Sequence, residues 1–375
     1  MPYSRAIWLE PNGSLSLRDI AERYEPSGAQ TLVSVEYSAI NPADIKHYYI
    51  IGAHSIVAGY EWIGPVLATG PNSPFKKGEM LFGLAPLADR KPLSAGAHQD
   101  RMLVEPYMTF RVPPPALSQR GEDWQTQVVS WTAAAHTVCD AFFNCMGFGF
   151  SPLGGPNAGK EIVSGVDPHG RAILIWGASS TVGLCAVQLA RIAGFSPILC
   201  TASPHNHEAL LGLGATACFN HRSPSVVSDI RAAVQASGKP LATIFDAVTV
   251  GTGIWEPPRA ASDPPLDLGK SSPAIAKQCL TEGIAPEEAR LSATLKVEFD
   301  EDWKFCMVIR NQEPSPDLQD RIDAAIQWLW GNAADVNFRI PKVKVVQGGD
   351  EGIKAIKDVY DGKVSMEKVV IKHPL

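Results

Sequence analysis

Residues 171–183 constrain the fold more than any other segment, because an apolar run there turns through small residues directly into a helical pattern. Apolar side chains recur at helical spacing after Thr181, and Gly194 can end the helix. A helix that follows a strand through a tight turn presents free N–H groups and the positive end of its dipole. We therefore predict a strand, a turn and a helix that together bind a phosphate.

The turn departs from the usual G-x-G-x-x-G motif, because Ala178, Ser180 and Gly183 hold its three glycine positions. Such a turn also occurs as a plain connection between strand and helix, so both interpretations stay open until the neighbouring strands are considered. If the turn binds a nucleotide, the hydroxyl groups of its serine and threonine residues add hydrogen-bond donors to the backbone N–H groups. The pyrophosphate is then expected at Ser179, Ser180, Thr181 and Val182.

The end of the second strand indicates which nucleotide binds. An NAD site places Asp or Glu there, whereas the predicted strand Pro197–Ala202 is followed by no acid before Glu208. A missing carboxylate removes the charge that would repel a 2′-phosphate. We expect NADPH, with contacts from His221, after the predicted strand Ala215–Asn220, and from Ser203, Pro204, His205 and Asn206. In the alternative interpretation these residues only cap the next helix.

The composition is that of a globular protein. A chain of 375 residues is long for one core, so two domains are expected, and 45% apolar and 19% charged residues are ordinary values. The net charge of −6, without a Lys/Arg-rich tract, argues against nucleic acid as a partner. Neither a signal-peptide core nor an apolar run of about eighteen residues is found. We expect a cytoplasmic protein that does not bind membranes.

The cysteines and histidines predict no metal site. The seven cysteines are scattered and form no C-x-x-C pair, so neither a zinc clip nor a disulfide framework is indicated. Cys185 and Cys200 lie in apolar segments and are expected in the core. The nine histidines show no ligand spacing such as H-E-x-x-H.

Strand and helix patterns divide the chain into regions. Residues 1–138 hold short strands between turn residues, among them Thr31–Tyr37, Gly64–Thr69 and Gly78–Gly83. Residues 139–324 alternate strands with helices, with Leu241–Val248 as the fourth strand, which predicts parallel βαβ units in a doubly wound sheet.

Residues 251–270 and the tail from Phe338 differ from the alternating strands and helices before them. Residues 251–270 are rich in Pro, Asp and Gly and are expected to form an irregular excursion. The tail from Phe338 returns to strand-like patterns and ends in an expected strand at Lys363–Ile371.

Five spaced motifs are spread over nearly the whole chain: Asn41–Lys46, Gly59–Val66, Lys77–Gly83, Gly177–Gly183 and Asp361–Ser365. Together they resemble the medium-chain dehydrogenase/reductase superfamily. Within that superfamily, fungal trans-acting enoyl reductases of the lovastatin type are similar at Ser203–Asn206, Ser272–Ala276 and Asp300–Trp303. The resemblance implies an α/β protein with a GroES-like substrate domain (1–138 and 325–375) and a Rossmann domain that binds NADPH (139–324).

Departures from the zinc-dependent members bear on the reaction. Zinc alcohol dehydrogenases have a ligand cysteine near the position of Ala43 and a ligand histidine at that of Tyr60, and they carry a four-cysteine structural zinc loop. Without a Lewis acid, alcohol oxidation loses the group that stabilises an alkoxide. Hydride addition to an alkene needs only a conjugated carbonyl, whose developing enolate oxygen hydrogen bonds can stabilise. The resemblance therefore implies enoyl reduction.

The resemblance also supplies two catalytic candidates. Lys46 follows the Asn-Pro-x-Asp turn, where its ammonium is expected to anchor cofactor or substrate or to polarise the thioester carbonyl. Thr137 matches a threonine at the start of the helix between the domains, near nicotinamide and substrate. In the structural alternatives, Lys46 is a solvated loop lysine and Thr137 a helix-capping residue. His136 is interpreted as a helix-face residue rather than the proton donor.

Further contacts are expected around these two residues. Cofactor contacts include Asp44, Ile45, Lys46, Val364 and Ser365, and the substrate segment is Thr137, Val138, Cys139, Asp140, Ala141, Phe142, Phe143 and Asn144. Asp44 is expected to fix its loop by an Asx-type bond rather than to act as a base. Glu61 and Asp246 are candidates for buried scaffold carboxylates, and the final proton is assigned to solvent.

The sequence thus predicts an NADPH-dependent trans-acting enoyl reductase. It would add hydride to the β-carbon of an α,β-unsaturated thioester on the acyl-carrier domain of a partner polyketide synthase, with a monomer favoured over a homodimer. One alternative is a free-standing quinone or enone reductase with the same cofactor residues. Another is an NADPH-binding assembly partner without catalytic activity.

Overall fold

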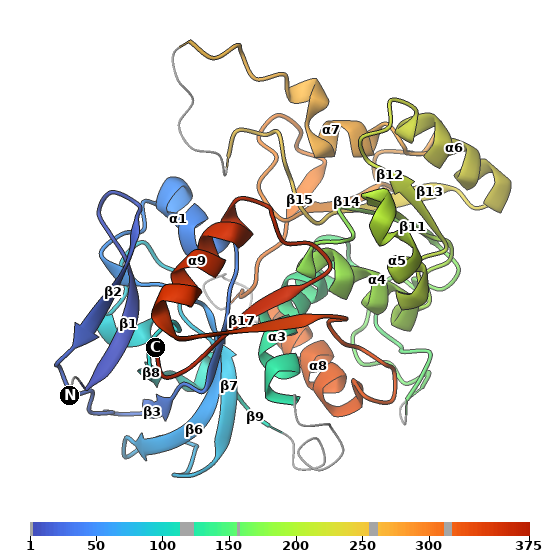
Figure 1. Cartoon of the computed structure of the whole chain (residues 1–375). Coiled ribbons are helices and arrows are strands. Elements are labelled where there is room, and N and C mark those ends of the chain that lie inside the picture. Colours follow the sequence, from blue (N-terminus) through green and yellow to red (C-terminus); the bar gives the residue numbers. More distant parts are fainter. Residues whose placement is uncertain (1–2, 113–123, 156–157, 255–261, 311–316) are drawn as a thin grey trace. The chain divides into compact units, whose positions relative to one another are not determined.

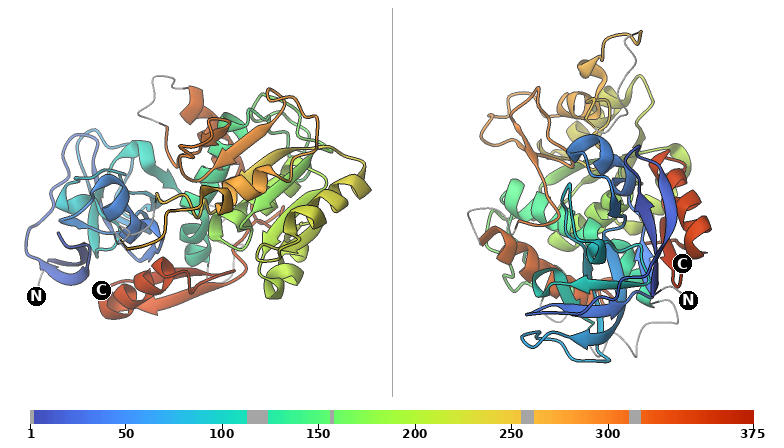
Figure 2. Two further views of the ribbon diagram at one scale, coloured as in Figure 1. Left: turned by 90° about the horizontal axis from the view of Figure 1, so that it is seen from above. Right: turned by 90° about the vertical axis from the view of Figure 1, so that its left-hand side faces the viewer.

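The computed structural model describes residues 3–112, 124–155, 158–254, 262–310 and 317–375, and these form two compact units (Figures 1 and 2). The first unit contains the described residues up to Ala133 and those from Ile340 onward, and the second contains the described residues between them. The predicted domain boundary at 138/139 lies near the end of helix α3 (Trp124–Cys139). That at 324/325 lies inside helix α8 (Asp317–Asn332).

The first unit is rich in strands. Its larger sheet has the order β16-β17-β4-β6-β3-β8, with β7 and β9 continuing from β6. The bounds are β16 Val343–Gln347, β17 Lys368–Lys372, β4 Tyr37–Ala39, β6 Glu61–Thr69, β3 Thr31–Ser34, β8 Arg101–Val104, β7 Met80–Leu84 and β9 Thr109–Arg111. A three-stranded sheet has the order β2 (Leu15–Ile20), β1 (Ser4–Leu9) and β5 (Ile56–Val57).

Two helices of this unit share one apolar core. Helix α1 (Ala43–Ile51) contributes Ile45, and helix α9 (Gly348–Tyr360) contributes Ala355 and Ile356, to a cluster that includes Ile371 of β17. The rings of Tyr49 and Tyr360 stack with their centroids 6.4 Å apart, which joins the two helices at their exposed side. Two short 3₁₀ turns, η1 (Leu93–Ala95) and η2 (Pro106–Met108), and the residues of α3 up to Ala133 also belong to this unit.

The second unit is a doubly wound parallel sheet. Its six strands have the order β12-β11-β10-β13-β14-β15, and every neighbouring pair is parallel. They are β12 Ala217–Asn220, β11 Ile198–Ala202, β10 Ala172–Trp176, β13 Leu241–Asp246, β14 Arg290–Ala293 and β15 Trp303–Phe305. In chain order this is 3-2-1-4-5-6, the arrangement of dinucleotide-binding folds, so the predicted fold class is confirmed.

Helices follow the strands of this sheet (Figure 1). They are α4 Thr181–Ala193, η4 Pro204–Asn206, α5 His207–Leu213, α6 Val226–Ser237, η5 Leu268–Lys270, α7 Ser272–Lys277 and α8. Helix α4 ends as predicted at Gly194, which has a left-handed φ of 90°. Cys185 and Cys200 are fully buried, which confirms their prediction as core residues.

Three sequence predictions need correction. The expected strand Thr31–Tyr37 is two strands, because β3 ends at Ser34 and β4 begins at Tyr37. The tail is not all strand: α9 lies between β16 and β17, because its apolar residues follow a helical period. The last strand therefore begins at Lys368 rather than at Lys363. Of the irregular excursion 251–270, residues 255–261 lie outside the described residues.

Candidate active site

The turn after β10 brings backbone segments too close together for side chains. Gly177 has a φ of 76°, and a Cβ atom there would lie 2.5 Å from Cγ1 of Val248. A Cβ atom at Gly183 would lie 2.5 Å from the carbonyl oxygen of Gly177, so helix α4 packs directly against the turn. The Gly177 N–H donates to Thr201 Oγ1 over 3.0 Å, which holds the turn to β11. This close approach fits a dinucleotide pyrophosphate.

Ser180 is the N-cap of helix α4. Its hydroxyl oxygen accepts from the Gly183 N–H at 3.0 Å and donates to the Gly177 carbonyl oxygen at 2.9 Å. The cap therefore uses the hydroxyl proton that was expected to serve the pyrophosphate. The backbone N–H groups of Ser179, Thr181 and Val182 have no hydrogen-bond acceptor among the described residues, and these three residues are partly exposed. They are the donors that the turn offers to an anion.

Polar residues gather where β11 and β12 end, because parallel strands place their carboxyl ends at one edge. Ser203 is partly exposed, His205 is exposed and Asn206 is buried. His221, directly after β12, donates to the Ala202 carbonyl, and His207 Nε2 lies 3.1 Å from the same oxygen. The sheet thus brings the predicted 2′-phosphate residues together at one edge.

Sequence reasoning passed over Arg222 at this edge. Its side chain is exposed, and the backbone N–H of Arg222 donates to Asn220 Oδ1 at 3.1 Å. Burial lowers the pKa of His221 and the charge of Arg222 lowers it further, while the hydrogen bond to Ala202 acts in the opposite direction. A cation directly after a predicted phosphate-contacting histidine was a signal already available in the sequence.

The predicted substrate segment forms the interior of the second unit. A π-helical turn, η3 (Asp140–Cys145), follows α3, and Phe142 and Phe143 are at most 1% exposed. The Phe142 ring makes edge contacts with the rings of Phe195 and Phe245. Val138, Cys139 and Ala141 are fully buried as well. Their side chains pack the core, so a substrate-binding role for them stays a prediction.

Asp140 belongs to a buried ion pair. Its carboxylate accepts from Arg310 Nε at 2.9 Å and Nη2 at 2.7 Å, and from the Met307 N–H at 2.7 Å. Asn144 donates to Asp140 Oδ1 at 2.8 Å and accepts from Arg321 Nε at 3.0 Å. These bonds give Asp140 and Asn144 structural partners within the unit.

Thr137 lies in the last turn of helix α3, not at the start of a helix as predicted. Among the described residues, helix α3 begins at Trp124 and continues to Cys139 without interruption, so Thr137 is close to its end. Thr137 is 8% exposed, and the neighbouring His136 is 1% exposed. The buried setting of His136 agrees with its interpretation as a helix-face residue.

In the first unit, the predicted cofactor residues lie on helix α1 and in the segment after α9. Asp44 is 2% exposed, and its Oδ2 accepts from the Asn41 N–H at 2.8 Å. This bond fixes the loop as predicted, but it is not an Asx turn. In an Asx turn the side chain accepts from an N–H later in the chain, whereas Asp44 accepts from an N–H three residues earlier. Ile45 is buried in the apolar core, and Lys46 is partly exposed on α1. Val364 packs against the same core after α9, and Ser365 is exposed.

The two scaffold carboxylates are buried as expected. Glu61 accepts from Lys368 Nζ at 2.8 Å, Asn41 Nδ2 at 2.7 Å and the Ala133 N–H at 2.7 Å. Asp246, in the second unit, accepts from the Ser272 hydroxyl at 2.5 Å and from two backbone N–H groups, and burial raises its pKa.

A cluster of ionisable side chains lies beside Asp44. The Tyr60 hydroxyl is 2.7 Å from His47 Nδ1, and Lys91 Nζ lies 4.6 Å from the centroid of the Tyr60 ring. Burial lowers the pKa of His47 to about 4 and that of Lys91 to about 8, although the Asp44 charge opposes both shifts. Burial raises the pKa of Tyr60. The cluster therefore holds a neutral histidine and an ammonium that can lose its proton near neutral pH.

Comparison with known proteins identifies the family. Residues 27–114 match the alcohol dehydrogenase GroES-like domain, and residues 181–257 match the zinc-binding dehydrogenase model. A dehydrogenase of Emericella nidulans, orsE, is 31% identical over 258 residues, which are 66% of this chain and 71% of the relative. The chain belongs to the medium-chain dehydrogenase/reductase superfamily. The predicted resemblance is confirmed.

A second relative and a solved structure extend the comparison. The trans-enoyl reductase grgB of Penicillium sp. is 29% identical over 240 residues, which are 64% of this chain and 61% of the relative. The match thus spans about three fifths of that relative. A putative zinc-dependent alcohol dehydrogenase of Rhizobium etli CFN 42 has the same fold, with a TM-score of 0.69 at 20% identity and 100% coverage of both chains.

Two observations concern metals and membranes. Within the part of the chain that the structure describes, no group of three or more His, Cys, Asp or Glu side chains is placed to hold a metal ion. At the two positions where zinc-dependent superfamily members carry ligands, Ala43 begins α1 and Tyr60 belongs to the ionisable cluster. None of the helices in the described ranges is long and apolar enough to cross a bilayer.

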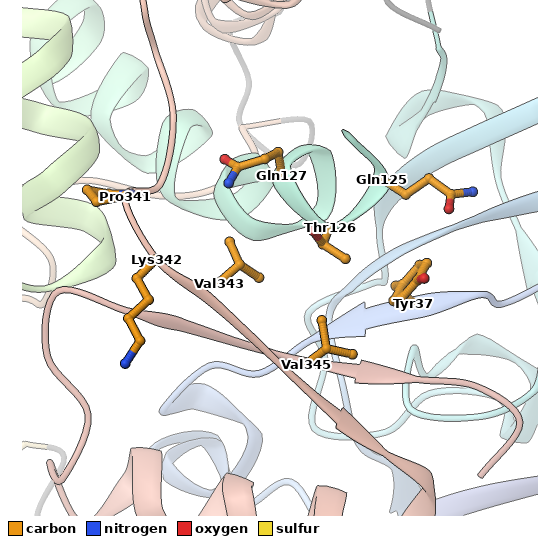
Figure 3. Close-up of a pocket in the computed structure, with 8 residues that line it drawn as sticks. All are labelled: Tyr37, Gln125, Thr126, Gln127, Pro341, Lys342, Val343 and Val345. Atoms are coloured by element: carbon orange, nitrogen blue, oxygen red, sulfur yellow. The ribbon is translucent and has the colours of Figure 1, made fainter. Parts of the chain in front are cut away.

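One pocket of about 480 Å³ lies in the first unit (Figure 3). Its lining residues come from α3, β4 and the segment around β16: Tyr37, Gln125, Thr126, Gln127, Pro341, Lys342, Val343 and Val345. None of the predicted cofactor or substrate residues is among them. The pocket therefore has no place in the candidate site of this superfamily member.

Proposed function

We propose that this superfamily member is an NADPH-dependent trans-acting enoyl reductase. Its substrate is an α,β-unsaturated acyl thioester on the acyl-carrier domain of a partner polyketide synthase. The observation that carries the reaction class is the similarity to proteins named trans-enoyl reductases in Penicillium, Fusarium heterosporum and Gibberella fujikuroi. The relatives described above are all named as reductases or dehydrogenases, so they do not favour the alternative of an assembly partner without catalytic activity.

The edge formed by β11 and β12 supports NADPH as the cofactor. Ser203, His221 and Arg222 present a hydroxyl, an imidazole and a guanidinium there, and the first acid after β11 is the exposed Glu208 on α5. A phosphate dianion is stabilised by such donors, whereas an NAD-specific carboxylate would repel it. The N–H groups of Ser179, Thr181 and Val182 would hold the pyrophosphate.

The proposed reaction assigns separate tasks to the chain's residues. NADPH, when bound, would supply a hydride for the substrate's β-carbon, and the negative charge that results on the thioester oxygen would need stabilising donors. Lys46 would stabilise that charge or anchor the bound molecules through its ammonium group. Thr137 would offer its hydroxyl as a second donor beside the substrate.

Carrier-bound and free substrates separate the proposal from its first alternative. We expect NADPH oxidation with an enoyl thioester on a carrier domain at a kcat/KM at least about tenfold above that with the matching free enone or a quinone, which corresponds to about 1.4 kcal/mol. Faster turnover of the quinone would support the free-standing reductase instead. NADPH binding without oxidation of any of these substrates would support the assembly partner.

Substitutions test the two catalytic candidates. Lys46→Met and Thr137→Val should each lower kcat/KM for the enoyl thioester by about 100- to 1000-fold, the usual range for a lost oxyanion donor. Lys344→Met, which replaces an exposed lysine on β16, is the matched control and should leave kcat/KM unchanged. Full enoyl reduction by the Lys46 or Thr137 variant would remove that residue from the mechanism.

A further inference from the structure

Two cysteines lie opposite each other on neighbouring strands of the second unit (Figure 1). Cys200 of β11 and Cys218 of β12 are direct partners in the parallel register, although helix α5 separates them in the chain. Neighbouring strands lie about 4.8 Å apart, and the Cα atoms of disulfide-bonded cysteines lie about 4.4–6.8 Å apart. Paired residues of parallel strands also point to the same face of the sheet. The register therefore places the two thiols where a disulfide can form.

The two thiol groups are hydrogen-bonded to each other in the reduced protein. The Cys200 thiol donates to the sulfur of Cys218, and Cys218 Sγ donates in turn to the His207 carbonyl oxygen over 3.8 Å. The bond from Cys200 lowers the pKa of Cys218, whereas burial raises the pKa of Cys200 well above its ordinary value. Because the thiolate is the reactive form of cysteine, Cys218 is the better nucleophile of the pair.

Exposure points to the same residue. The seven cysteines all lie in the described ranges, and five of them are buried, whereas Cys145 and Cys218 are partly exposed. Burial raises the pKa of Cys145 to about 12, so its thiol stays protonated at neutral pH. Cys218 instead combines partial exposure with a lowered pKa, and it lies on β12, the strand at one end of the parallel sheet. An oxidant from solvent should therefore react first with Cys218.

The pair allows a balanced oxidation by hydrogen peroxide. The Cys218 thiolate attacks a peroxide oxygen, the O–O bond breaks, hydroxide leaves, and Cys218 becomes a sulfenic acid. The Cys200 thiol then attacks that sulfur, the S–O bond breaks, water leaves with the thiol proton, and the disulfide forms. The two sulfurs together lose two electrons, which the peroxide gains. Cys200 is fully buried, but it needs no contact with the oxidant because it meets only the sulfur of Cys218.

Both strands continue from this pair to the edge proposed for the 2′-phosphate. Ser203 follows Cys200 by three residues, and His221 follows Cys218 by three residues. A covalent bond between the strands draws them together at Cys200 and Cys218, because bonded sulfurs are closer than hydrogen-bonded ones. The positions of Ser203 and His221 relative to each other should change as a result.

A second connection runs through His207. Its imidazole Nε2 lies 3.1 Å from the Ala202 carbonyl oxygen, which also accepts from His221. Disulfide formation removes the thiol proton of Cys218 and with it the bond to the His207 carbonyl oxygen. Oxidation therefore changes the contacts of a residue that adjoins the proposed phosphate site.

We propose that Cys200 and Cys218 form a peroxide-oxidisable thiol pair whose disulfide weakens NADPH binding. The disulfide depends only on the register of β11 and β12, whereas its effect on the cofactor rests on the proposed function. Binding and oxidation are linked, so bound NADPH should favour the reduced pair by the same factor by which the disulfide weakens NADPH binding.

Peptide mapping after treatment of the whole protein with hydrogen peroxide tests the disulfide without cofactor or substrate. We expect a linked pair of peptides that contain Cys200 and Cys218, which dithiothreitol separates again. In Cys200→Ala the reaction should stop at the Cys218 sulfenic acid, which dimedone labels, whereas Cys145→Ala should still form the disulfide. A treated parent protein with both thiols free, or with Cys218 oxidised but not linked to Cys200, would overturn the proposal.

Titration with NADPH tests the effect on the cofactor. The disulfide form should bind NADPH about tenfold more weakly than the reduced form, and dithiothreitol should restore the affinity. Cys218→Ser is the matched control, because peroxide should leave its NADPH affinity unchanged. Equal affinities of the two forms of the parent protein would overturn the link between the thiol pair and the cofactor. A reduced parent that does not bind NADPH would instead contradict the proposed cofactor, while the peptide map would still decide whether the disulfide forms.

Discussion

In the second unit, the polar residues of the candidate site follow consecutive parallel strands and lie partly at the surface. In the first unit, several polar residues are instead buried and pair across distant segments: Ser38 bonds His373, which is 335 residues away. Neighbouring parallel strands have their carboxyl ends at the same edge of the sheet. The local sequence is therefore enough to predict that Ser203, after β11, and His221, after β12, lie at one edge. Burial of charge instead requires partners supplied by the whole unit, as Glu61 and Lys368 illustrate.

The largest expected effect concerns a buried ion pair in the second unit, between Asp140 and Arg310. Asp140→Ala should lower the free energy of unfolding by about 3–5 kcal/mol, because it leaves Arg310 without its buried carboxylate. Chemical denaturation measures the change, and the exposed Asp335→Ala variant in the same unit should stay within about 0.5 kcal/mol of the parent.

This first prediction separates a scaffold role from a substrate role for residues 138–144. If Asp140→Ala retained parental stability and lost only affinity for the enoyl thioester, Asp140 would be a substrate contact as the sequence predicted, and its ion pair would have little structural value.

The second prediction concerns the surface edge formed by β11 and β12. Ser203→Asp should weaken NADPH binding by about tenfold or more and leave NADH binding equal or stronger, because the new carboxylate repels the 2′-phosphate and suits ribose hydroxyls. Titration of cofactor binding measures both affinities. Ser228→Asp adds the same charge to the exposed face of α6 as a control. Equal weakening of NADH and NADPH would mean that Ser203 does not distinguish the two cofactors.

The most gradual expected effect is a pH dependence from the first unit. The folded pKa of His47 is about 4 against an ordinary 6.5, so the unfolded chain binds a proton that the folded chain does not. Stability should therefore fall as pH decreases from about 6.5 towards 4, by up to about 1.4 kcal/mol per pH unit from this residue.

Unfolding free energies across this pH range provide the measurement. His47→Gln should flatten the slope, whereas His54→Gln, at an exposed histidine three residues after α1, should not. An unaltered slope in His47→Gln would assign the acid sensitivity to other groups, such as His373, whose pKa burial also lowers.

The sequence predicted most of the second unit because its signals are local. The apolar run of β10, the small-residue turn and the period of α4 are contiguous, and the missing acid after β11 is visible without a structure. Arg222 was within reach of the same reasoning. The role of Ser180 as a helix cap was not, because the same hydroxyl could bond either a phosphate or the Gly183 N–H.

The first unit was harder to predict for a physical reason. His98, Lys91 and His373 are single ionisable residues in segments without a motif, and only the folded sheet brings them to Ser38 and Tyr60. The helix α9 was missed because strand-forming residues on both sides dominate the tail's pattern. The placement of Thr137 failed because the sequence does not mark where α3 begins.

The most direct test of the proposed function uses NADPH with deuterium at the transferable position and an enoyl thioester on a carrier domain. Mass spectrometry of the acyl product should find one deuterium at the β-carbon, with one NADPH consumed per double bond reduced. Transfer from NADPH should also exceed that from NADH at equal concentration. A product without deuterium, or NADPH oxidation without a saturated acyl chain, would contradict the assignment as an NADPH-dependent enoyl reductase.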